Sequence, residues 1–226
     1  MMVYVGQTRS RKLIADLTAR GFGEMAARGE MPPRRRPWAF DNGAYGDWKA
    51  GTLFDAEAFR ADVATIAALA PAEAPDFLVV PDLVAEGMAS LQASMRWLPE
   101  LRARVACPLY LAVQDGMPPS AVAAVIAQFD GLFVGGTLPW KLATGGTWVE
   151  LGHSLARPVH VGRVGTAKRV TWAIGIGADS IDSTLPLWSK ENLRSFRCRA
   201  PRAVASGRPP GLMAASDRHA KPEAVR

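Results

Sequence analysis

Cysteine is scarce in this chain of 226 residues, and its two cysteines, Cys107 and Cys198, lie far apart in the sequence. Neither belongs to a C-x-x-C pair or to any other spacing that is typical of a metal site. The sequence therefore excludes a cysteine-based zinc or iron–sulfur centre. We expect two reduced thiols in a reducing compartment.

Long apolar runs are absent as well. No segment approaches the roughly 18 to 20 apolar residues that a membrane-spanning helix needs. The first residues, MMVYVGQTRSRK, place their charges after a very short apolar segment, which is the reverse of the order in a secretory signal. We therefore expect a cytoplasmic protein without a membrane partner. The chain also lacks the internal repeats of a solenoid and the G-x-x-x-x-G-K-[ST] phosphate-binding loop.

The composition is that of a globular protein, with 49% hydrophobic and 21% charged residues. The formal net charge is +6, and residues 200–226 contribute half of it through five basic and two acidic residues. Because this stretch is rich in Pro, Ala and Arg and has no apolar periodicity, we expect a disordered basic tail over 200–226 after a single domain over 1–199. The basic balance permits a nucleic-acid partner but does not require one.

Short apolar runs alternate with helical patterns along the domain. The expected strands are 2–6, 38–43, 77–82, 109–114, 132–136, 159–163 and 180–182. Helical spacing between them groups Phe59 with Val63 and Ile66, Met88 with Leu91, Met95 and Leu98, and Val122 with Val125, Ile126 and Phe129. This alternation predicts an α/β fold with a parallel sheet covered by helices, either open or closed.

Polar residues or glycines follow most of the expected strands, which favours a closed TIM-like (β/α)8 barrel. The residues concerned are Asp41, Asp82, Gln114, Gly135, Gly136, Arg163 and Asp182. Because only seven strands are recognisable, this barrel is either complete or reduced by one strand. In such a barrel the carboxyl ends of the strands meet on one face, where the chemistry takes place. Taken singly, each aspartate has a simpler explanation as a helix N-cap, and the glycine pair as a tight turn. Asp82, before LVAEGMASL, fits the capping role well.

Two loops carry further signals. Asp41 precedes Asn42-Gly43, a strong turn signal, and Tyr45 follows as an aromatic surface on which a flat ring could stack. The segment HVGRVGTAKRV resembles the phosphate-accepting loops late in many barrels, with Thr166 as the expected N-cap of the next helix.

Taken in order, six segments resemble the guanine transglycosylase superfamily, which includes the queuine and archaeosine tRNA enzymes and the 7-deazaguanine DNA-modification transglycosylases. FDNGAY is similar to the DSGGFQ-type segment of the family, VVPDLV to its LDE-type strand end and AVQDG to IQQG. FVGGTLPWK is similar to IGGLAVGE, GRVGTAK to MGVGTP, and GADSIDSTLP to the G-D-FDCVLP segment. The resemblance runs from about Phe40 to Pro186 and implies a TIM-like barrel.

The resemblance also implies roles for individual residues. It places the nucleophile at Asp182 and the general acid/base at Asp41. The residues that bind the base are then Asp82, Gln114, Gly135, Gly136, Tyr45 and Lys141. The implied activity replaces guanine in nucleic acid by a free 7-deazaguanine base through a covalent aspartyl-glycosyl intermediate.

Departures from the family pattern favour DNA over tRNA as the partner. Only Cys198 follows Asp182, so the zinc site of the bacterial tRNA enzymes is missing and no cofactor is expected. Lys141 stands where those enzymes have a glutamate, which favours a neutral acceptor base such as 7-cyano-7-deazaguanine unless Lys141 points to solvent. For contacts to the nucleic acid we predict Arg34, Arg35, Arg36, Arg163, Lys190 and Arg194.

Two alternatives remain at this stage. One is a tRNA-guanine transglycosylase with a reduced barrel. The other is a non-catalytic nucleic-acid-binding barrel in which Asp41 and Asp182 are helix caps.

Overall fold

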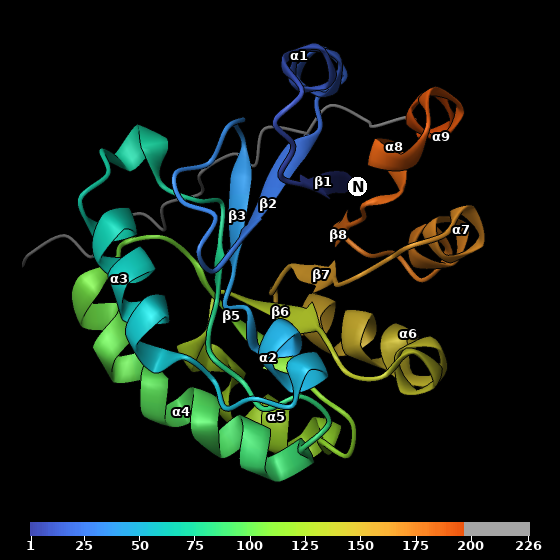
Figure 1. Cartoon of the computed structure of the whole chain (residues 1–226). Coiled ribbons are helices and arrows are strands. Elements are labelled where there is room, and N and C mark those ends of the chain that lie inside the picture. Colours follow the sequence, from blue (N-terminus) through green and yellow to red (C-terminus); the bar gives the residue numbers. More distant parts are fainter. Residues whose placement is uncertain (197–226) are drawn as a thin grey trace, which may run out of the picture.

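The computed structural model describes residues 1–196, which form a closed barrel of eight parallel strands (Figure 1). The strands are β1 (Met2–Gly6), β2 (Gly23–Ala27), β3 (Trp38–Asp41), β4 (Leu78–Val79), β5 (Leu109–Val113), β6 (Gly131–Val134), β7 (Val159–Val161) and β8 (Ser180–Asp182). Each strand pairs with the next along the chain, and β8 closes the barrel on β1 with Asp182 opposite Tyr4. The predicted TIM-like barrel is confirmed. The predicted tail over 200–226 lies outside the described residues.

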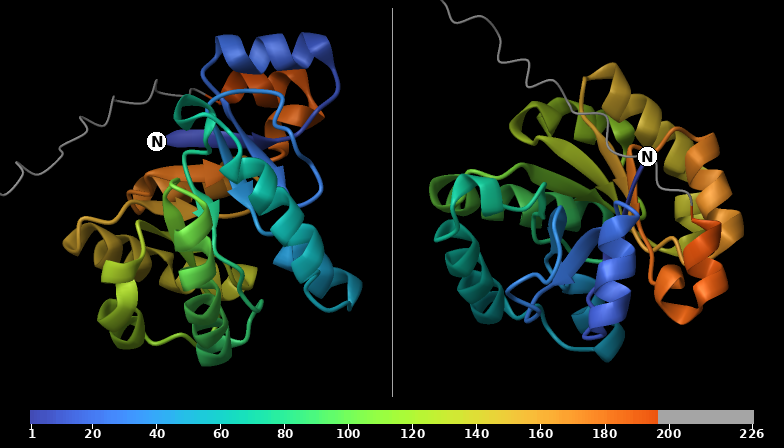
Figure 2. Two further views of the ribbon diagram at one scale, coloured as in Figure 1. Left: turned by 90° about the vertical axis from the view of Figure 1, so that its left-hand side faces the viewer. Right: turned by 90° about the horizontal axis from the view of Figure 1, so that it is seen from above.

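Helices surround the strands on the outside (Figure 2). They are α1 (Arg11–Ala19), α2 (Ala44–Ala50), α3 (Ala56–Ala67), α4 (Gly87–Arg104), α5 (Pro119–Val125), α6 (Leu138–Ser154), α7 (Ala167–Gly175), α8 (Leu185–Trp188) and α9 (Lys190–Ser195), with 3-10 turns η1 (Pro71–Glu73) and η2 (Ile126–Gln128). The apolar face predicted from Phe59, Val63 and Ile66 is buried. Met88 is 41% exposed although Leu91 and Leu98 of the same expected face are buried, because α4 begins only at Gly87 and its first turn stands at the barrel rim. No helix within residues 1–196 is both long and apolar enough to cross a membrane.

Strand β2 was not predicted from the sequence. Its residues, GEMAA, lack the β-branched and aromatic side chains that are typical of strands. Its first residue is a glycine because Tyr4 of β1 lies across it: a Cβ at Gly23 would stand 2.6 Å from the Tyr4 ring. The strand is therefore specified by its neighbours rather than by its own propensity.

Residues 28–37, which connect β2 to β3, contain no helix, so an ion pair covers the barrel wall at this point. Arg35 and Glu24 approach to 3.3 Å, and both side chains are fully buried. Arg35 Nη2 also donates to the backbone oxygen of Val5 at 2.8 Å and to that of Gly23 at 3.3 Å. Arg35 thus takes the place of a covering helix.

The inside of the barrel is filled by a cluster that is separate from the layer between strands and helices. It consists of Tyr4, Met25, Ala39, Phe77, Val79, Tyr110, Ala112 and Phe133. His160 of β7 extends this cluster, since its ring stacks on Phe133 with centroids 4.9 Å apart. The apolar filling stops at the carboxyl ends of the strands, where polar side chains take over.

Candidate active site

Most of the predicted polar residues meet at the carboxyl ends of the strands around one small cavity, whereas Gly136, Lys141 and Asp182 are on the same rim but not among the residues that line it. It is lined by Asp41, Asn42, Tyr45, Val79, Asp82, Val84, Gln114, Phe133, Gly135 and Arg163. The lining comes from β3, β4, β5, β6 and β7 and the loops that follow them. The closed parallel barrel brings these separate segments together because every strand points its carboxyl end to the same rim.

Asp182 ends β8 on this rim with its side chain 17% exposed. Its Oδ1 accepts two hydrogen bonds, from the backbone N–H of Arg163 at 2.9 Å and from Nε2 of His160 at 3.0 Å. Burial acts to raise the pKa of this carboxyl, but the hydrogen bond and charge of His160 outweigh it and hold the pKa below its ordinary value. Asp182 is therefore an ionised carboxylate held from two sides.

His160 was missed by the sequence reasoning. It is fully buried, and its Nδ1 lies 2.8 Å from the hydroxyl of Ser180, so both ring nitrogens have partners. The signal was present: His160 stands between Val159 and Val161, and strand alternation turns it into the barrel when its neighbours face the helices. A polar side chain that points into the barrel from β7 needs hydrogen-bond partners, and here these are Ser180 and Asp182 of β8.

Asp41, at the end of β3, lies close enough to Asp182 for their charges to interact. Its Oδ1 accepts from the N–H of Gly43 at 2.9 Å. Burial and then the negative charge of Asp182 raise the pKa of Asp41 above its ordinary value, against that hydrogen bond. The two carboxyl groups are thus shifted in opposite directions, which is the arrangement expected of an acid/base and a nucleophile.

Asp82 is the centre of a buried hydrogen-bond network. It accepts from Nδ2 of Asn42 at 2.7 Å and from Nε2 of Gln114 at 2.5 Å. Burial raises the pKa of Asp82 to about 6 in spite of these donors. Asn42, which the sequence indicated only as a turn residue, fixes this carboxylate through its amide and also bonds the backbone of Val80.

The glycine pair after β6 is required by packing. A Cβ at Gly135 would stand 2.5 Å from Nε2 of Gln114, and one at Gly136 would stand 2.5 Å from Trp140. Gly136 also has a φ of 70°, which side chains disfavour. Its N–H, predicted to face the base, donates to Oε1 of Gln114 at 2.8 Å in this conformation.

Arg163 lines the cavity together with Tyr45. Its guanidinium carbon lies 3.5 Å from the ring centroid of Tyr45, and its Nη2 donates to the backbone oxygen of Gly136 at 2.6 Å. Its φ of 57° is unusual for a side-chain-bearing residue, and this backbone conformation accompanies the bond from its N–H to Asp182. The remaining cavity volume is about 30 Å³, room for about two water molecules and too little for a purine.

Lys141 does not point to solvent. Its side chain is buried, and its Nζ donates to the backbone oxygen of Gly162. Burial and, after it, the charge of Arg163 lower the pKa of Lys141 to about 7. The structure thus places this cation beside Asp182, which is among the charges that act on it.

The capping explanation fails for all three aspartates. The N-cap residues are Gly43 for α2, Glu86 for α4 and Thr184 for α8. Asp41 does support the turn before α2 through Gly43, so it has a local structural role as well. Thr166 caps α7, as predicted, by accepting from the N–H of Arg169.

The loop arginines do not gather at the site. Arg35 is buried against Glu24, which places its guanidinium out of reach of a phosphate. Arg36 precedes β3 and pairs with Glu73 before β4, at the amino ends of the strands and thus on the opposite rim. Arg34 and Lys190 are exposed, and the side chain of Arg194 lies outside the described part of the chain.

Within residues 1–196 the structure contains no group of three or more His, Cys, Asp or Glu side chains that could hold a metal ion. Comparison of the sequence with models of known protein families and with curated proteins gives no match.

Proposed function

We propose that this protein is a base-exchange transglycosylase that replaces guanine in DNA by a 7-deazaguanine, most suitably the neutral 7-cyano-7-deazaguanine. The observation that carries the proposal is the pair of neighbouring carboxyl groups with opposite pKa shifts, Asp41 raised and Asp182 lowered. Beside them, Asp82 and Gln114 line the cavity with a carboxylate and an amide, which can form hydrogen bonds with the edge of a base. The sequence resemblance to the guanine transglycosylases supports the same assignment.

The first half of the reaction breaks the bond between guanine and the sugar. An oxygen of Asp182 attacks C1′ of the target nucleotide, the C1′–N9 bonding electrons pass to guanine, and Asp41 gives the departing base a proton. The raised pKa of Asp41 keeps that proton available, and the lowered pKa of Asp182 keeps the nucleophile ionised. His160 and the Arg163 N–H hold one oxygen of Asp182, which leaves the other to form the bond.

The second half restores the carboxylate. N9 of the incoming 7-deazaguanine attacks C1′, the ester bond to Asp182 breaks, and the N9 proton passes to Asp41. Two inversions at C1′ give net retention. Neither half requires a redox partner or a metal.

Entry of a base requires two side chains to move. The base that stacks on Tyr45 replaces the guanidinium of Arg163, and Gln114 must release the N–H of Gly136 before that donor can meet the base oxygen. The buried cation at Lys141 opposes an aminomethyl ammonium on the acceptor base, which supports the neutral acceptor. Comparing cyano- and aminomethyl-deazaguanine in the same exchange assay tests this step, and preference for the amine contradicts it.

Exchange of radiolabelled guanine into DNA tests the proposal as a whole. Replacement of Asp182 by Asn should reduce exchange by at least about 1,000-fold, because the amide is a poor nucleophile. The exposed Glu150→Gln serves as the charge-matched control and should retain activity. Quenched reactions of the wild-type protein should contain a protein–DNA adduct that is absent in Asp182→Asn. Exchange into tRNA but not DNA would favour the tRNA alternative, and unchanged exchange in Asp182→Asn would refute the mechanism.

A further inference from the structure

The direction in which the nucleotide must leave the site follows from the positions of its two ends. The groups that bind the base belong to β3–β6 and their loops, whereas Asp182, which meets C1′, ends β8. The sugar and its two phosphates therefore continue beyond β8. The helices next to β8 on this rim begin after β7, β8 and β1, and they are α7, α8, α9 and α1.

Cations without ion pairs stand at the starts of these helices. Among residues 1–196, the structure records no salt bridge for Lys12 of α1, Lys168 and Arg169 of α7, or Lys190 of α9. The guanidinium of Arg169 lies beside the loop after β7, since a Cβ at Gly165 would stand 3.9 Å from its Nη1. Two acidic residues, Asp16 and Glu191, lie on the same helices and leave the set net positive.

On the opposite side of the molecule, several arginines form salt bridges. Arg28 pairs with Asp47 at 2.6 Å and Arg60 pairs with Glu100 at 2.9 Å. Arg104 also approaches Glu100, at 3.4 Å. Other cations without a recorded salt bridge, among them Arg20, Lys49 and Arg96, stand singly at the end of α1, on α2 and on α4, whereas the four cations beside β8 stand on neighbouring helices on the side where the phosphates must lie.

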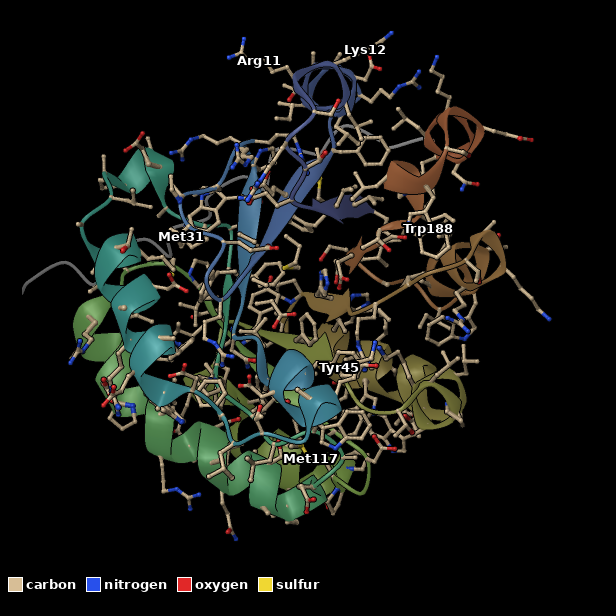
Figure 3. The ribbon with its side chains drawn as sticks, viewed as in Figure 1. Arg11, Lys12, Met31, Tyr45, Met117 and Trp188 are labelled. Atoms are coloured by element: carbon tan, nitrogen blue, oxygen red, sulfur yellow. The ribbon has the colours of Figure 1, made fainter. Side chains whose placement is uncertain are left out.

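A groove and an exposed tryptophan mark the same side. The groove of about 280 Å³ runs between α1 and α8–α9, with Lys12 and Lys190 in its wall and an apolar floor of Leu13, Pro186 and Leu187. Trp188 is 73% exposed and stands six residues after Asp182. Figure 3 shows Trp188 beside α8, away from Tyr45, so it is available to a different base from the one bound on α2.

We propose that Lys12, Lys168, Arg169, Trp188 and Lys190, here called the β8 flank, bind the DNA strand that carries the target nucleotide. The cations contact the phosphates on either side of the extruded nucleotide, and Trp188 stacks on a neighbouring base. This inference rests on the proposed function for the position of C1′, but it concerns binding and is tested without turnover. It replaces the predicted role of Arg35 and Arg36 by residues on the catalytic rim.

Salt dependence of binding to a fluorescent single-stranded DNA oligonucleotide tests the β8 flank. The triple variant Lys12→Ala/Lys168→Ala/Lys190→Ala should bind about 10- to 100-fold more weakly near 0.1 M salt and lower the slope of log affinity against log salt by about 2. The matched control is Arg20→Ala/Arg96→Ala/Arg104→Ala, which removes three exposed charges elsewhere. It should leave the slope unchanged, and equal losses in both triples would overturn the proposal.

Trp188 gives an independent measurement. Its fluorescence should be quenched by the oligonucleotide, and Trp188→Ala should weaken binding about 10-fold without lowering the salt slope. Absence of both effects, with melting temperatures unchanged, would remove Trp188 from the flank. Tighter, flank-dependent binding of an RNA of the same sequence would overturn the choice of DNA.

The two proposals fail in different ways. If guanine exchange proceeds normally in the lysine triple and its salt slope is unchanged, the β8 flank is wrong and the transglycosylase stands. If the triple loses binding but the wild-type protein exchanges no base, the flank stands as a DNA-binding surface and the enzymatic proposal is refuted.

Discussion

Asp41 and Asp182 carry the same chemical group on the same rim, and their surroundings separate them. Both are enclosed, but Asp182 receives hydrogen bonds from His160 and from the Arg163 backbone, whereas Asp41 receives one from Gly43 and faces the charge of Asp182. This difference in donors and charges shifts the two pKa values in opposite directions, as the proposed acid/base and nucleophile roles require.

Asp82 should set the acid limit of base exchange. Because burial raises its pKa to about 6, the side chain loses its charge below that pH, which weakens the hydrogen bonds that it accepts from Asn42 and Gln114 and so disturbs the proposed base-binding network. We expect kcat/KM to fall about tenfold per pH unit below about pH 6 and to lose this dependence in Asp82→Asn. The exposed Glu86→Gln is the control and should keep the fall in kcat/KM at acid pH. If Asp82→Asn also keeps this fall, the titration belongs to another group.

The raised pKa of Asp82 also determines how this residue changes the free energy of unfolding as the pH changes. The folded protein keeps the Asp82 proton to a higher pH than the unfolded chain, whose carboxyl titrates near pH 4. The contribution of Asp82 is therefore present below about pH 4 and is lost as the pH rises through about 6. Asp182, with its lowered pKa, acts in the opposite direction.

We expect the buried amine of Lys141 to lower the free energy of unfolding at neutral and acidic pH. Its pKa of about 7 in the folded state lies below the ordinary value of an exposed lysine, so the unfolded chain holds the proton more tightly. Lys141→Met should raise the free energy of unfolding by about 1–3 kcal/mol at pH 6, with the gain shrinking as the pH rises from about 7 to about 10. Urea titrations across that range, with exposed Lys49→Met as the control, measure it, and a gain that grows with pH would contradict the sign.

Sequence reasoning found the parts of the site that end strands. Asp41, Asp82 and Gln114 follow apolar runs, so the barrel rule predicts that they meet. His160 shows where that reasoning stops, because its role depends on the inward face of a three-residue strand. Arg163 was predicted as a strand-end residue, but its left-handed backbone was not, because no local pattern requires it. The stacking of Arg163 on Tyr45 joins segments more than a hundred residues apart and follows only from the folded structure.

At the level of elements, the wall around β2 is the part that departs from the regular barrel. Seven strands could be recognised from β-rich runs, whereas GEMAA has the composition of a helix or loop and is held by Tyr4 on one side and by the Glu24–Arg35 pair on the other. A buried pair of this kind depends on both partners, because removal of one leaves an uncompensated charge.

Double substitution should therefore rescue single substitution at this pair. Arg35→Met alone should lower the free energy of unfolding by about 3–5 kcal/mol, and Glu24→Leu/Arg35→Met should lower it by clearly less. Chemical unfolding of the two single variants and the double variant measures the coupling. Additive losses would mean that Arg35 stabilises the wall through Val5 and Gly23 rather than through Glu24.

For the whole molecule, closure between β1 and β8 positions Asp182, the proposed nucleophile. The N–H of Ser183 donates to the Tyr4 backbone oxygen at 2.9 Å, and Ile181 stands opposite Val3 with no exposed surface. Ile181→Ala should cost about 2–5 kcal/mol of unfolding free energy, because the barrel cannot collapse around the cavity. The control Ile174→Ala, at a side chain that is 58% exposed, should cost less than about 1 kcal/mol. Similar losses in the two variants would show that the pairing of β1 with β8 is not critical for stability.

The pairing of the first strand with the eighth also sets an order of events during synthesis. β1 can pair with β2 soon after synthesis, but its other edge must wait for β8, more than 170 residues downstream. Asp182 is made at the moment when the ring of strands can first be completed. In the proposed mechanism, a nascent chain therefore carries no reactive carboxylate on an unfinished scaffold, and its capacity to attack a sugar arises together with the architecture that restrains it.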